Sequence, residues 1–142
     1  MSRLPVRASV RPKLRVALTA WFAAHADSPF ALGVGGRLAY LQAKRDWPKP
    51  YAVLAIPVAM PRDTITERID TVSLQVMVFG AGSLQVEELA GLALDLFEGR
   101  VISGPGLAPF ELSRGEDVPT LPDDDGVWQA GIQLSGLVET IL

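Results

Sequence analysis

The sequence predicts a single α+β domain, in which two helices pack on one face of a mainly antiparallel sheet. Two segments place apolar residues at helical spacing, and two long segments alternate apolar with polar residues as half-buried strands do. A length of 142 residues suits one hydrophobic core, and 49% hydrophobic with 20% charged residues is typical of a folded chain. Residues 1–11 are predicted to form a flexible basic N-terminal arm, and residues 12–142 the domain.

The first helix is predicted to begin near Pro12 and to end around Asp27. Proline suits the first turn of a helix, and the residue before Pro29 disfavours helical backbone angles. The apolar stripe of this helix faces the core, and basic residues occupy the other side. The stripe consists of Leu14, Ala17, Leu18, Trp21 and Phe22.

Two short strands are predicted next, after a glycine-rich turn. The first spans residues 37–42 and the second residues 50–60. Pro57 lies inside the second strand and has no N–H for a β-ladder. It therefore predicts an edge strand or a bulge.

The segment "ERIDTVSLQVMVFG" contains the clearest strand, because it alternates over its whole length. Val72, Leu74, Val76 and Val78 are predicted to face the core. A second helix is predicted over residues 84–98, with Ser83 as its N-cap and Gly99 at its end.

The remaining chain is predicted to form two more strands around an acidic loop. The first lies near residues 109–113, and "EDVPTLPDDD" is expected to be a loop or a mobile finger. The last strand alternates again, and Trp128 is expected to be a core residue at its start. Its predicted core face holds Trp128, Ala130, Ile132, Leu134 and Val138.

The opposite faces of the two long strands carry no charge. A sheet face in water usually carries Lys and Glu, which keep it soluble and prevent pairing with other sheets. These faces are therefore predicted to be covered, either by another copy of the protein or by a second layer of the same chain. They consist of Thr71, Ser73, Gln75 and Met77 on one strand and Gln129, Gly131, Gln133 and Ser135 on the other.

Charge is divided along the chain. Residues 1–62 hold ten Lys or Arg and two Asp, a net +8, and residues 63–142 hold three Arg and fourteen Asp or Glu, a net −11, which sum to −3. This division fits either a nucleic-acid contact by the basic half or head-to-tail contact between copies. Candidate contact residues are Arg3, Arg7 and Arg11 in the arm, and Glu116, Asp117, Asp123, Asp124 and Asp125 in the acidic half.

The residues that usually carry chemistry are scarce. The chain has no cysteine and a single histidine, His25, so we expect no catalytic, metal or cofactor-binding residues and no enzyme activity. "GVGGRL" has Leu38 where a dinucleotide-binding loop needs its third glycine, and "DDDG" lacks the spaced ligands of a calcium loop. No apolar stretch approaches the length of a membrane span, so we expect a protein made in the cytoplasm with no membrane partner.

The order of these motifs resembles the tail terminator (tail completion) proteins of long-tailed phages, prophages and gene-transfer particles. The resemblance rests on "SPFALGVGGRLAY", the entry "KPYAVLAI", the long strand ending "VFG", the helix start "SLQVEELAGLA" and the last strand opening "DDGVWQAGIQL". It implies a non-catalytic, cofactor-free subunit of a hexameric ring at the head-proximal end of a virion tail. It also implies that Tyr51 lies beside a subunit boundary.

The resemblance further implies the partners of such a ring. They are other copies of the chain, the major tail tube protein and the head-tail connector or stopper protein, with DNA only passing through the ring lumen and assembly in the cytoplasm of the host bacterium. Two other functions remain open from the residues. One is a neck or head-completion adaptor or stopper, and the other is a nucleic-acid-binding module that uses the basic half.

Overall fold

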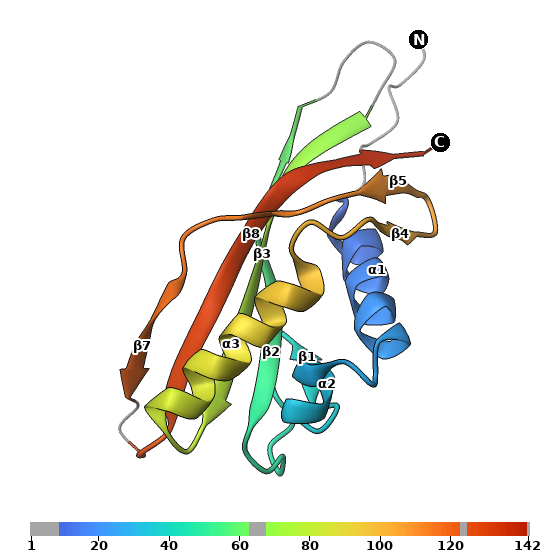
Figure 1. Ribbon diagram of the computed structural model, residues 1–142. Helices are drawn as coiled ribbons and strands as arrows, with labels where there is room; N and C mark the ends of the chain where they lie inside the picture. Colours follow the sequence, from blue (N-terminus) through green and yellow to red (C-terminus); the bar gives the residue numbers. More distant parts are fainter. Residues whose placement is uncertain (1–8, 63–67, 123–124, 142) are drawn as a thin grey trace, which may run out of the picture.

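The computed structural model describes residues 9–62, 68–122 and 125–141, and it confirms an α+β domain (Figure 1). Helices and long strands lie where the sequence predicts them, with several short elements between. The elements in chain order are α1 (Arg11–Ala24), α2 (Pro29–Gly33), β1 (Leu38–Tyr40), β2 (Tyr51–Pro61), β3 (Arg68–Gly80), α3 (Ser83–Phe97), β4 (Ile102–Gly104), β5 (Leu107–Phe110), β6 (Ser113–Arg114), β7 (Val118–Pro122) and β8 (Trp128–Thr140).

The strands form one mixed sheet in the order β1-β2-β3-β8-β5-β4, and β6 and β7 also pair with β8. β1 runs parallel to β2, whereas the other pairs are antiparallel. β3 and β8 pair along their full lengths, from Arg68 opposite Thr140 to Gly80 opposite Trp128. These two strands are therefore the centre of the sheet.

The three helices lie on one face of the sheet, as Figure 1 shows. The core lies between the helices and the inward face of β2, β3 and β8, because alternate residues of these strands are buried. The predicted core residues of β3 are all buried, and so are Ala130, Ile132, Leu134 and Val138 of β8. None of the helices in the described ranges is long and apolar enough to cross a membrane.

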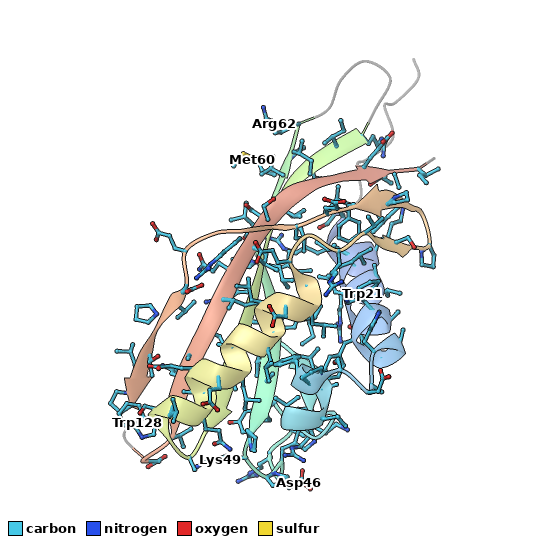
Figure 2. All side chains as sticks on the ribbon, in the orientation of Figure 1. Trp21, Asp46, Lys49, Met60, Arg62 and Trp128 are labelled. Carbon is cyan, nitrogen blue, oxygen red and sulfur yellow. The ribbon has the colours of Figure 1, made fainter. Side chains whose placement is uncertain are left out.

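The prediction that Trp128 is a core residue is wrong. Trp128 is half-buried and packs against the rim of the core, because it is the first residue of β8 and lies opposite Gly80 at the end of the β3–β8 ladder. Figure 2 shows it at the end of the sheet. Period-two alternation predicts the correct face but not the depth of burial, because no further β3–β8 pair lies beyond Trp128 to cover its outer side.

The bulge predicted at Pro57 is confirmed. The register of β2 against β3 shifts between Ala55 and Val58, so two residues of β2 lie outside the ladder. β1 pairs with β2 only from Ala52 to Leu54, so the bulge lies beyond the end of β1. Pro57 is tolerated there because no ladder hydrogen bond requires its missing N–H.

Two helix boundaries differ from the prediction. α1 ends at Ala24 rather than near Asp27, and the predicted glycine turn begins instead with the short helix α2. The Ser28 hydroxyl accepts a hydrogen bond from the Ala31 N–H, and Pro29 occupies the first turn.

The N-cap of α3 is Gly82, and Ser83 is the first helical residue rather than the cap. Gly82 has extended backbone angles, as an N-cap residue does. The Gln85 side chain reaches back and accepts a hydrogen bond from the Ala81 N–H at 3.1 Å. This bond satisfies a donor at the helix start without a serine cap.

The acidic segment predicted to be a loop or a mobile finger contains β7. β7 pairs with the first residues of β8, from Val118 opposite Gly131 to Pro122 opposite Trp128. Two prolines and flanking acids give this segment a low β-propensity, so its composition does not predict a strand. It forms a strand because it pairs with the otherwise free edge of β8.

Candidate assembly surfaces

The face of β2, β3 and β8 that points away from the helices is here called the open face (Figure 1). Its residues are those that alternate with the buried ones and lie in register across the three strands. They are Tyr51, Val53, Ala55, Val58 and Met60 of β2; Ile69, Thr71, Ser73, Gln75, Met77 and Phe79 of β3; and Gln129, Gly131, Gln133, Ser135, Leu137 and Glu139 of β8.

The open face is almost without charge. Among its described residues only Glu139 is ionisable at neutral pH, and it lies at one end. Gln75 lies directly opposite Gln133, and Ser73 opposite Ser135. The predicted interface residues Thr71, Ser73, Gln75, Gln129 and Gln133 are therefore brought together on one surface.

Next to Glu139, a row of the open face is apolar and exposed. Met60, Thr71 and Leu137 form a row across the three strands, and Met60 is 59% and Leu137 54% exposed. The Thr71 hydroxyl oxygen is buried and has no hydrogen-bond partner within the described part of the chain. Figure 2 shows Met60 at the end of the sheet away from Lys49.

The other end of the open face is aromatic. Tyr51 stacks on Phe79 with ring centroids 5.2 Å apart, and Trp47 lies 6.3 Å from Tyr51. Two hydrogen bonds from Arg37 to the Pro50 carbonyl oxygen, at 3.1 and 2.8 Å, hold the entry to β2. The Lys49–Pro50 peptide bond is cis. The two ring contacts and the two Arg37 hydrogen bonds hold Tyr51 at the corner of the open face.

The centre of the open face is tightly packed. Met77 lies over Gly131, its partner on β8, and the Gln75 amide nitrogen is 3.6 Å from the Met77 sulfur. A Cβ added to Gly131 would also lie 2.7 Å from the Val76 carbonyl oxygen. Only glycine therefore lets β8 approach β3 this closely here.

The predicted basic contact residues are only partly within the described chain. Arg3 and Arg7 lie outside the described residues. Arg11, which the sequence placed in the arm, is the first residue of α1, and its guanidinium donates to the carbonyl oxygens of Ile56 and Pro57, both at 3.1 Å. It thereby satisfies two acceptors at the bulge and ties α1 to β2.

The predicted acidic contact residues lie near β7. Asp123 and Asp124 are outside the described residues, whereas Glu116 and Asp125 are exposed. Asp117 accepts a 2.7 Å hydrogen bond from Arg114, and this bond with the negative charge raises the pKa of Arg114 above its ordinary value. Arg114 stays protonated in any case, so the pair is a fixed surface ion pair.

An exposed stripe on α1 was not predicted from the sequence. A groove of about 660 Å³ runs along it, lined by Pro12, Arg15, Val16, Thr19, Ala23 and Tyr40, and is here called the α1 groove. Pro12, Val16, Ala20 and Ala23 recur at helical spacing, so the signal was present. The stronger inward stripe obscured it.

The described residues offer little for chemistry. They contain no group of three or more His, Cys, Asp or Glu that would hold a metal ion. The centroids of the His25 and Trp21 rings are 4.1 Å apart, and the Nδ1 atom of His25 lies 2.8 Å from the Trp21 carbonyl oxygen. The two surfaces described above, the open face and the α1 groove, are suited to packing against another macromolecule.

No family model matches this sequence, and no curated protein does. A chain from a solved structure of the virion of a native gene transfer agent particle is similar in structure, with a TM-score of 0.74 and 16% sequence identity. The match covers 94% of this chain and 99% of that one. A second solved chain, 19% identical over 94% of each chain, has a TM-score of only 0.47. At these identities the first likeness establishes the fold alone.

Proposed function

We propose that this protein is a structural subunit of a phage-like virion, which forms a ring, in the leading form a hexamer, at the head-proximal end of the tail. The ring caps the tail tube, ends its polymerisation and joins the tail to the head connector. Its partners are its own copies, the tail tube protein and the connector or stopper protein, and DNA passes through its lumen.

The open face carries this proposal. It spans the three longest strands, holds neutral polar and apolar side chains, and has no helix over it. An open, uncharged sheet face is a liability for a monomer in water, because nothing on it opposes association with other sheets. In a ring it is either covered by a neighbouring protein or faced by other copies across the lumen.

The fold likeness supports the viral part of the proposal. The similar solved chain belongs to the virion of a gene transfer agent particle, and this protein matches it over nearly the whole length of both. The structural match does not indicate where in a particle this protein would lie. The proposed position, a ring at the end of the tail, combines this fold with the order of the sequence motifs.

The proposal predicts the effect of charge on the open face. Gln75 and Gln133 lie directly opposite each other, so Gln75→Glu with Gln133→Glu places two like charges side by side and brings charges from neighbouring copies together. We expect ring formation to weaken while the monomer stays folded. Native mass spectrometry and electron microscopy measure the ring, and circular dichroism measures the fold.

The matched control is Gln75→Glu with Gln133→Lys, which places an opposite-charge pair at the same positions. We expect this variant to assemble better than the double glutamate. If the wild-type chain is monomeric at all concentrations and forms no annular particles, the proposed ring is wrong. If the double glutamate assembles as the wild type does, the open face is not the surface that carries it.

A further inference from the structure

The charge division of the sequence becomes a division in space. The basic half supplies α1, β1 and the 42–50 loop, and the acidic half supplies β7 and α3. In the sheet, β1 is the edge next to β2, whereas β7 pairs on β8. Figure 1 shows α1 and β7 on opposite sides of the long strands.

The α1 groove combines an apolar floor with a positive rim. Val16 is 53% exposed on the floor, and the Arg15 guanidinium lies 4.4 Å from the centroid of the Tyr40 ring, which holds it at the rim. Lys44 and Arg45 follow on the neighbouring loop, against the single acid Asp46.

The β7 edge has the complementary composition. Leu121 is 50% exposed, and Glu116 and Asp125 flank the strand as exposed carboxylates. Glu87 of α3 lines the hollow beneath β7 together with Arg114 and Asp117, and because these two form an ion pair, the unpaired acids among the described residues on this side are Glu87, Glu116 and Asp125. The β7 edge therefore presents the exposed apolar side chain of Leu121 with acids nearby. The α1 groove, on the other side of the molecule, presents an apolar floor with cations nearby.

We propose that the α1 groove of one copy receives the β7 edge of a second copy, with Leu121 on the apolar floor and Glu116 and Asp125 near Arg15 and Lys44. This inference rests on the proposed ring and adds to the open face a pair of surfaces through which neighbouring copies meet. The contact is made by side chains rather than by a continued β-ladder, because Pro119 and Pro122 interrupt the N–H donors of β7.

The opposite placement of the two surfaces determines the kind of assembly. Each copy presents a groove on one side and a β7 edge on the other, so every copy bonds two neighbours through unlike surfaces. Such heterologous contacts close into a ring or extend into a filament. They also leave the open face of every copy on the same side of the ring wall.

Charge reversal tests the pairing. Arg15→Glu and Glu116→Lys should each raise the protein concentration at half-assembly at least about tenfold in low salt, which corresponds to about 1.4 kcal/mol. The double variant Arg15→Glu/Glu116→Lys restores opposite charges across every contact, so its midpoint should return to within about threefold of the wild type. Sedimentation velocity measures all four chains.

The control variants are Arg100→Glu and Asp95→Lys. They make the same charge changes at exposed positions that line neither the α1 groove nor the hollow beneath β7 and that do not belong to the open face. Both should assemble as the wild type does. If the two test variants also assemble normally, or the double variant is no better than either one, the pairing is wrong while the proposed ring stands. A wild type that never assembles overturns the ring itself.

Cysteine cross-linking tests the contact without relying on charge. The chain contains no cysteine, so introduced thiols are the only ones. Thr19→Cys with Leu121→Cys in one chain should give a ladder of linked copies on oxidation, because each contact joins a groove to a β7 edge. Thr19→Cys with Met60→Cys uses an equally exposed partner site away from β7 and should give no ladder. A ladder from Thr19→Cys with Met60→Cys, and none from Thr19→Cys with Leu121→Cys, would overturn the proposal. The proposal would also be wrong if the α1 groove bound DNA and Arg15→Glu abolished that binding without changing assembly.

Discussion

Gly131 is a residue of the open face at which the two central strands leave no room for a side chain. Met77 covers it from β3, and the Val76 carbonyl oxygen leaves no room for a methyl group. Sequence alternation alone placed this glycine among the outward residues. Its reason for being glycine is visible only from the neighbouring strand.

We expect Gly131→Ala to destabilise the fold by about 1–3 kcal/mol, because the added Cβ forces the β3 backbone away from β8. Urea denaturation measures the free energy of unfolding. The control is Gly91→Ala in the middle of α3, where an added Cβ meets nothing within 4 Å. This change should stabilise the protein by about 0.5–1 kcal/mol. A Gly131→Ala protein as stable as the wild type would show that the strands are farther apart than described.

At the scale of elements, β8 provides a comparison between the rim and the centre of the core. Leu134 is fully buried in the middle of the strand, whereas Trp128 is half-buried at its start. Leu134→Ala should therefore cost about 3 kcal/mol or more, within the usual range for a buried leucine. Trp128→Ala should cost less, about 2 kcal/mol, because part of its ring already contacts water.

Thermal and urea unfolding of both variants give the comparison. A larger loss for Trp128→Ala than for Leu134→Ala would mean that the end of β8 is packed as deeply as its centre.

The long elements were predictable because their signals are local. β3 and β8 alternate over their whole lengths, and α1 and α3 carry apolar stripes at helical spacing. The parallel pairing of β1 was not predictable, since periodicity gives no strand direction. β7 escaped prediction because its partner strand, and not its own composition, makes it a strand. α2 did have a signal, the Ser28–Pro29 start, but five residues give no periodicity to support it.

Some features of the candidate surfaces were also predictable from local sequence patterns, and others depend on contacts between distant parts of the chain. The uncharged open face follows from period-two alternation, and the register adds that Gln75 and Gln133 are direct neighbours. The intrachain use of Arg11 was beyond the sequence, because its acceptors at Ile56 and Pro57 are more than forty residues away in the chain.

At the scale of the whole molecule, the basic residues Arg3 and Arg7 precede α1 in the sequence. We propose that Arg3 and Arg7 contact acidic groups of a neighbouring copy or of the tail tube. Deletion of residues 1–8 should weaken assembly or tube capping at low salt, and the difference should shrink at high salt because exposed ion pairs are screened within about 8 Å at physiological ionic strength. The deletion must stop before Ser9, because Val10 is buried at the start of α1.

A length-matched variant, Arg3→Gln with Arg7→Gln, separates charge from chain length. It should behave as the deletion does. Capping by the truncated chain that equals the full-length protein at every salt concentration would exclude a role for the arm.

The full-length pairing of β3 with β8 has a consequence for how the chain folds during synthesis. β3 ends at Gly80 and β8 begins at Trp128, so the ribosome must translate α3 and four short strands before the central ladder has its second half. β2 and β3 are neighbours in sequence and form a hairpin early, but one edge of β3 stays unpaired until β8 arrives. A nascent chain arrested before Trp128 should therefore be sensitive to protease and bind chaperones, and one extended well past Thr140 should resist protease as a single unit.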